Sequence, residues 1–126
     1  MKLKDIEPNK LFKLNPNDLA IYWKDDRIGY VCYINGDHVT RTQFPNNTTV
    51  YPGIQAELKE KRLTAGQIPV YDPFCFEGDP TICWVTNHAE GSTKYWYVGY
   101  CGQLIHESCS DFLQVRKVNN VKVIEG

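Results

Sequence analysis

The dipeptide Asn35-Gly36 is the strongest local constraint on how this chain can fold. It lies between segments 27–34 and 37–44, which are rich in β-branched and aromatic residues. Asn-Gly readily takes the two positive φ angles of a type I′ turn, which joins two antiparallel strands through a two-residue loop. The sequence therefore predicts a β-hairpin in which Ile34 lies opposite Asp37.

A third strand precedes this hairpin. The apolar segment Leu19 to Trp23 is followed by Lys24-Asp25-Asp26, a polar stretch that predicts a turn. The three strands together predict an N-terminal β-meander. Because side chains alternate between the two faces of a strand, one face should carry Ile28, Tyr30, Cys32 and Ile34, with Val39 opposite.

The segment 53–65 predicts the single helix of the chain. Pro52 suits the first helical position, where an N–H group is not needed, and Gly66 suits the position just after the helix. Glu57 and Lys61 form a favourable i,i+4 pair. An amphipathic helix that covers a sheet is therefore expected, with an apolar stripe of Ile54, Leu58 and Ala65.

The second half of the chain predicts further strands. Thr81 to Asn87 and Lys94 to Tyr100 alternate in polarity and favour a hairpin around a loop at 88–93. The remaining expected elements are a short strand at 68–71, a loop at 72–80, a strand at 103–106, a helical turn at 108–113 and a hairpin at 115–124 around Asn119-Asn120.

The expected fold class is α+β. It is an antiparallel β-rich single domain, residues 1–126, with an N-terminal β-meander, one central amphipathic helix, a second β-hairpin sheet and a C-terminal hairpin. A chain of 126 residues is near the usual size of one domain.

The charge pattern predicts neither a nucleic-acid partner nor a membrane. The net charge is −1, and the basic residues are scattered along the chain. The N-terminal residues show no signal peptide, and no apolar run approaches the roughly 20 residues that cross a bilayer. These features predict a cytoplasmic protein.

The five cysteines are interpreted as reduced, buried thiols. Seven residues separate Cys75 from Cys83, and seven separate Cys101 from Cys109, whereas zinc ligand pairs are usually two to four residues apart. A thiolate nucleophile would need a base such as His88 within reach, and no local motif provides one. We therefore expect no catalytic residue, no metal ligand and no cofactor, and keep a zinc- or cysteine-dependent protein as an alternative.

An acidic cluster and a glycine-rich loop are the other patterns that could carry chemistry in a chain of this kind. Asp72, Glu77 and Asp79 cluster in one segment, but acidic residues and Gly are also what a turn-rich loop requires. The chain contains neither of the glycine-rich patterns that cradle phosphates. Neither motif predicts a reaction.

The segment Tyr95-Trp96-Tyr97-Val98-Gly99-Tyr100 is the most unusual feature of the sequence. It places aromatic residues on both faces of one strand. Such a strand is either covered on both sides or offers one surface for recognition, a role in which Tyr and Trp are enriched. The second interpretation predicts a partner- or ligand-binding surface made of Trp84, His88, Tyr95, Trp96, Tyr97 and Tyr100.

These observations favour a non-enzymatic protein-binding module. Small inhibitors, immunity proteins and phage-encoded anti-host or anti-defence proteins act in this way, by docking to another protein. A small-molecule-binding protein with an aromatic pocket is the first alternative. A monomer and a homodimer both fit the sequence.

Overall fold

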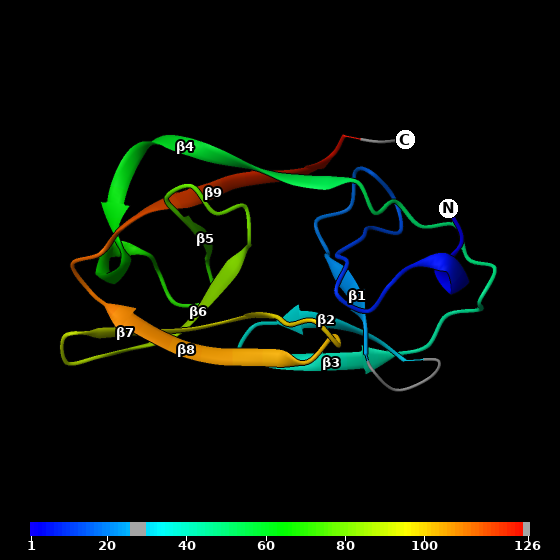
Figure 1. Ribbon diagram of the computed structural model, residues 1–126, viewed down its shortest axis with the longest axis horizontal. Coiled ribbons are helices and arrows are strands. Elements are labelled where there is room, and N and C mark those ends of the chain that lie inside the picture. The colour runs from blue at the N-terminus through cyan, green and yellow to red at the C-terminus, as the bar shows by residue number, and fades with distance from the viewer. Residues whose placement is uncertain (26–29, 125–126) are drawn as a thin grey trace. The chain divides into compact units, whose positions relative to one another are not determined.

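The computed structural model describes residues 1–25 and 30–124 and is nearly all β (Figure 1). Strands account for 53% of the chain and helical turns for 5%, and the strands form two antiparallel sheets. The helical turns are η1 (Leu3–Asp5) and η2 (Ala65–Gln67), each three residues long. The expected α+β class with a central helix is therefore wrong, whereas the expected antiparallel β-sheets are confirmed.

The chain forms two compact units. The first consists of Met1–Gln55, Val98–Gln103 and Lys122–Gly126, and the second consists of Ala56–Tyr97 and Leu104–Val121. Within the residues that the structure describes, no helix is long and apolar enough to cross a membrane.

The first unit contains the expected β-meander. Its strands are β1 (Tyr22–Lys24), β2 (Val31–Asn35) and β3 (His38–Thr42), and they pair antiparallel in the order β1-β2-β3.

The register of the β2–β3 hairpin differs from the predicted one. Ile34 lies opposite Val39, and Asn35 lies opposite His38, so the loop consists of Gly36 and Asp37. Gly36 has a φ of 64°, whereas Asp37 has no positive φ. One glycine at the first central position is the pattern of a type II′ turn rather than type I′. Because the shift is two residues, each side chain keeps its predicted face; Ile28 lies outside the described residues.

A buried tryptophan joins the meander to the 98–103 segment of the same unit. Trp23 is 1% exposed, and its indole Nε1 donates a 2.8 Å hydrogen bond to the carbonyl oxygen of Gly102. Tyr22, the residue before Trp23, exchanges backbone hydrogen bonds of 2.8 and 2.9 Å with Phe12. The core of this unit contains Leu3, Ile6, Phe12, Val31 and Val50.

The second sheet has six strands in the order β4-β9-β5-β6-β7-β8. They are β4 (Ile54–Thr64), β5 (Pro73–Phe76), β6 (Cys83–Ala89), β7 (Ser92–Val98), β8 (Leu104–Ser110) and β9 (Gln114–Val123). Parts of β4 and β9 extend into the first unit, and the two strands run side by side (Figure 1). The core of the second unit contains Ala65, Ile68, Phe74, Cys83, Val85, Tyr95 and Val115.

The segment predicted as the helix forms the edge strand β4. Ile54 and Leu58 are four residues apart, a spacing that shares one face in a strand as well as in a helix. Leu63 packs against the core of the second unit, which contains Ala65, the first residue of η2. The hydrogen-bonded sheet order, with β4 next to β9, identifies the segment as a strand. Pairing with β9 therefore outweighs the helix propensity of the Glu- and Lys-rich sequence.

The predicted C-terminal hairpin is also wrong. Residues 114–123 form one continuous strand, β9, between β4 and β5. The hairpin would have placed Lys117 opposite Lys122. In β9, Lys117 lies opposite Phe74, and its ammonium group lies 3.0 Å from a carboxylate oxygen of Asp72.

Four shorter segments also differ from expectation. Tyr71 has a φ of 74°, which excludes the strand predicted at 68–71. The segment 72–80 is not all loop, because Phe74 and Cys75 are buried in β5. The β6–β7 loop shrinks to Glu90 and Gly91. Strand β8 covers 104–110 and so replaces the first half of the predicted helical turn at 108–113.

Substitution at Gly102 should destabilise the protein far more than the same change at Gly36. Both residues have a positive φ, but a Cβ at Gly102 would overlap the carbonyl oxygen of Lys24, whereas a Cβ at Gly36 meets no atom within 4 Å. We expect Gly102→Ala to lower the free energy of unfolding by about 2–5 kcal/mol and Gly36→Ala by about 1–2 kcal/mol. Urea unfolding followed by tryptophan fluorescence measures both, and equal losses would contradict the close packing at Gly102.

Candidate functional site

The six residues of the predicted aromatic surface have very different exposures. Trp84, Tyr95 and Trp96 are buried, at 7%, 6% and 7% exposure. His88 and Tyr97 are half-buried, and Tyr100 is 83% exposed. The structure pairs Trp84 with Trp96 across β6 and β7. Burial of both Tyr95 and its neighbour Trp96 favours a strand covered on its two faces, and a binding role for the six residues stays a prediction.

Tyr95 and Tyr97 share one acceptor on the neighbouring strand. Their hydroxyl groups donate to the two carboxylate oxygens of Glu107, at 3.1 and 3.2 Å. Burial, and then the hydrogen bond to this carboxylate, raises the pKa of Tyr95. The ring of Tyr95 also packs edge-on against Phe74 and Phe76, with centroids 5.6 and 5.3 Å away. These contacts tie β5, β7 and β8 together and use the aromatic rings in packing.

A buried threonine links three segments at one end of the second unit. Thr93, at the start of β7, is 0% exposed, and its hydroxyl donates a 2.7 Å hydrogen bond to the Asp111 carboxylate. The Nδ1 atom of His88 lies 3.2 Å from the same hydroxyl oxygen. The Nε2 atom of His88 lies 2.7 Å from the carbonyl oxygen of Ile68.

The hydrogen-bond directions in this network follow from the acceptors. The Ile68 carbonyl can only accept, so Nε2 of His88 carries a proton and donates it. The Thr93 hydroxyl group lies between the Asp111 carboxylate and the imidazole of His88, and it has a single hydrogen. It can donate to only one of them at a time, and the shorter contact is the one with Asp111.

Asp111 fixes the turn between β8 and β9 through its backbone as well. Its N–H donates to the carbonyl of Gly91 at 3.1 Å, and its carbonyl accepts from the N–H of Gly66 at 2.9 Å. The N–H of Ala65 donates to the carbonyl of Leu113 at 2.9 Å. The turn is therefore held by both the β6–β7 loop and η2.

This rigid turn exposes two large apolar side chains, which we call the apolar turn: Phe112 and Leu113. Phe112 is 82% exposed and Leu113 is 46% exposed. The sequence prediction placed both residues in a helical turn at 108–113 and so missed them as surface groups. The signal available was Ser110-Asp111, a pair of turn-forming residues directly before them; the Phe112 N–H does donate to the Ser110 hydroxyl at 3.2 Å.

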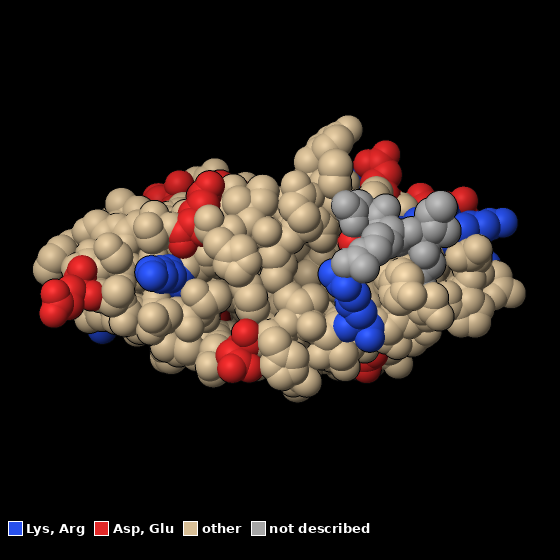
Figure 2. All heavy atoms as spheres, turned by 90° about the horizontal axis from the view of Figure 1, so that it is seen from below, with Lys and Arg blue, Asp and Glu red and all other residues tan. Residues whose placement is uncertain are grey.

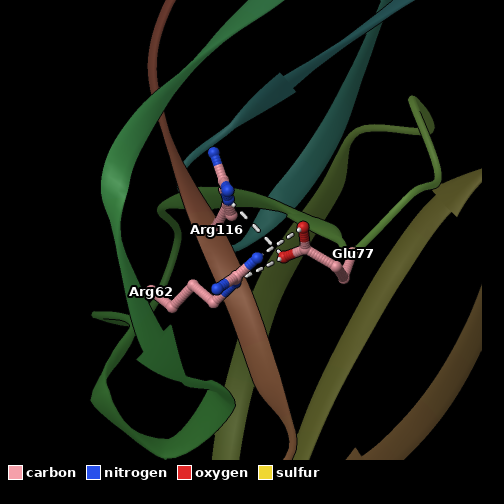
Figure 3. A network of polar contacts seen from close by, with 3 residues as sticks. All are labelled: Arg62, Glu77 and Arg116. Atoms are coloured by element: carbon pink, nitrogen blue, oxygen red, sulfur yellow. Dashed lines mark hydrogen bonds and ion pairs between the residues drawn. The ribbon is translucent and has the colours of Figure 1, made fainter.

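A groove lies at another place in the second unit, beside the β5–β6 turn. Its volume is about 340 Å³, and we call it the β5–β6 groove, lined by Leu58, Phe76, Glu77, Gly78, Asp79, Pro80 and Arg116. Glu77 is held there by two arginines from neighbouring strands (Figure 3). Arg62 donates to both carboxylate oxygens at 3.2 and 3.4 Å, and the Nε atom of Arg116 lies 3.5 Å from Oε2.

The cysteines do not assemble into a site. Among residues 1–25 and 30–124, no group of three or more His, Cys, Asp or Glu side chains is placed to hold a metal ion. Burial raises the pKa of Cys75 to about 11 and that of Cys83 to about 12, and it also raises the pKa of Cys32 and Cys109. Thiols in such surroundings stay protonated at neutral pH and are poor nucleophiles.

The face in view in Figure 2 has no large patch of one charge: basic and acidic groups lie there in small separate clusters.

Comparisons with protein-family models, with curated proteins and with solved structures found no match for the chain.

Removing the Thr93 hydroxyl should destabilise the second unit. Thr93→Val leaves the Asp111 carboxylate without this donor and His88 Nδ1 without its partner, so we expect a loss of about 1–3 kcal/mol in the free energy of unfolding. Thr93→Ser keeps the hydroxyl and removes one methyl group, so its loss should be smaller. Urea unfolding of the two variants provides the comparison, and an equal loss would show that the methyl group rather than the network matters.

Cysteine reactivity should follow exposure. Cys101 is exposed, whereas Cys75 and Cys83 are buried with raised pKa values. At pH 7 we expect iodoacetamide to label Cys101 more than about tenfold faster than the two buried thiols, because the thiolate is the reacting form. Peptide mass spectrometry over a time course measures the rates. Fast labelling of Cys75 or Cys83 would revive a thiolate-based function.

Proposed function

We propose that the protein is a non-enzymatic binding module that docks to another protein through the apolar turn. The observation that carries this proposal is the 82% exposure of Phe112 in a turn whose backbone is fixed on both sides by hydrogen bonds. A large aromatic side chain that is exposed but rigidly presented is a typical anchor of a protein interface.

The energetics support this use of the turn. Burying a Phe side chain in a partner pocket contributes about 1.5–3 kcal/mol. The bonds between Asp111, Gly91 and Gly66 fix the backbone before any partner arrives. Binding would therefore lose little additional backbone entropy, which is the usual advantage of a preorganised surface.

The proposal changes the location of the predicted surface but keeps the predicted class. Trp84, Tyr95 and Trp96 serve as packing groups beneath the strands, and the apolar turn becomes the contact surface. Small inhibitors, immunity proteins and phage-encoded antagonists belong to this class. We place the protein in the cytoplasm, where its free thiols remain reduced.

Site-specific photocrosslinking tests the proposal. Benzoylphenylalanine replaces Phe112 in one variant and Leu19, a 93% exposed residue of the first unit, in the control. In cells that naturally produce the protein, we expect a discrete crosslinked protein from position 112 and none from position 19. The same adducts from both positions, or none from either, would contradict docking through the apolar turn.

Affinity measurements with the crosslinked partner then test the energetic role of Phe112. Phe112→Ala should weaken binding by about 2 kcal/mol, or about 30-fold, with an unchanged unfolding curve. Leu19→Ala, a change at a residue 93% exposed in the first unit, should leave the affinity unchanged. Tyr100→Ala tests the aromatic surface predicted from the sequence. If Tyr100→Ala lowers the affinity and Phe112→Ala does not, the docking site lies at the aromatic segment.

A further inference from the structure

The β5–β6 groove shares no residue with the apolar turn, and it has the size and lining of a ligand site. Its volume of about 340 Å³ falls within the range of small-molecule pockets, which is roughly 300–1,000 Å³. Leu58, Phe76 and Pro80 provide apolar walls from β4, β5 and the segment after β5. Three of the seven lining residues are charged, namely Glu77, Asp79 and Arg116, and such groups can orient a bound molecule.

The charges around the groove cancel. Glu77 accepts from Arg62 and lies beside Arg116, and Asp79 adds a second carboxylate to the lining. The hydrogen bond from Arg62 holds the pKa of Glu77 below its ordinary value, so this carboxylate is ionised at neutral pH. Two guanidinium groups and two carboxylates favour neither an anionic nor a cationic ligand.

One hydrogen-bond donor at the groove is only weakly held. The Nε atom of Arg116 is buried and makes no hydrogen bond, and its contact with Oε2 of Glu77 is a long ion pair of 3.5 Å. In Figure 3, Arg62 approaches the carboxylate along its two oxygens, and Arg116 reaches the same group from another strand. A buried donor that makes no hydrogen bond is costly, so an oxygen acceptor that reaches this guanidinium would be favoured.

We propose that the β5–β6 groove binds a small uncharged molecule that carries an apolar ring beside a carbonyl oxygen. The ring packs against Leu58, Phe76 and Pro80, and the carbonyl oxygen accepts a hydrogen bond from the guanidinium of Arg116. The Nε–H of Arg116, whose side chain is 29% exposed, would exchange its 3.5 Å ion pair with Glu77 for a hydrogen bond to the ligand.

Three probes with the same phenyl ring test the chemical class. N-acetylphenylalaninamide is neutral and has carbonyl groups, phenylacetate is an anion, and phenethylamine is a cation. In ¹⁵N-resolved NMR titrations we expect the neutral amide to bind at about millimolar Kd and to shift the Gly78 amide and the Arg116 Nε–H signals. The two charged probes should bind at least about fivefold more weakly, since each meets a like charge.

Two substitutions on β4 provide the matched control. Leu58→Trp fills the groove, whereas Lys59→Trp adds the same ring to the next residue of the strand, whose side chain lies on the opposite face. We expect the amide to lose binding to the first variant and to keep it with the second. Arg116→Lys, which has no Nε–H group, should remove the preference for the neutral probe.

Several outcomes would overturn the inference. Equal affinity for the three probes, signal shifts away from the groove, or equal binding to the two tryptophan variants would each show that no site for this chemical class exists here. Tight binding of phenylacetate alone would show that the arginines dominate and that the site binds anions. None of these outcomes depends on the apolar turn, so this inference and the docking proposal can fail separately.

Discussion

The hydrogen bond between the buried Thr93 hydroxyl and the Asp111 carboxylate is the constraint on which the end of the second unit depends. It joins the first residues of β7 to the turn after β8, and Asp111 uses its backbone to reach Gly91 and Gly66 as well. One residue thus connects the β6–β7 loop, η2 and the β8–β9 turn. A Cβ at Gly66 would lie 3.0 Å from the Cβ of Asp111, so the small residue at position 66 is part of the same arrangement. Phe112, which is 82% exposed, is the next residue after Asp111 in this turn.

The sequence predicted the strand-forming segments better than their partners. Asn35-Gly36 did identify a hairpin, and Glu90-Gly91 did lie between two strands, because turn chemistry is local. The helix at 53–65 was wrong because its evidence, a spacing of four residues, fits both periodicities. Strand β9 was missed because Asn119-Asn120 resembles a turn, whereas its pairing with β4 and β5 depends on residues that are distant in the sequence. Such long-range pairing is not encoded in any short window.

The candidate sites show the same limit. Arg62, Glu77 and Arg116 are far apart in the chain and meet only because β4, β9 and β5 are neighbours in the sheet. Glu77 was noticed in the sequence as a loop carboxylate, but nothing local pointed to its two arginine partners. The aromatic segment 95–100, by contrast, was predicted to be a surface site. Its composition suggested a surface, whereas Tyr95 and Trp96 are buried. Phe112, which is 82% exposed, lay in the predicted helical turn at 108–113 and was not recognised as a surface group.

The helix-like composition of β4 has a consequence for how copies of this chain meet one another. An eleven-residue strand at the edge of a sheet presents a long row of backbone groups to which another strand could add. The charged residues of that edge include Glu57, Lys59, Glu60 and Lys61. An incoming apolar strand would have to desolvate these charges, and lysines on edge strands are a common defence against such pairing. The same residues that misled the helix prediction therefore oppose the addition of a second strand to this edge.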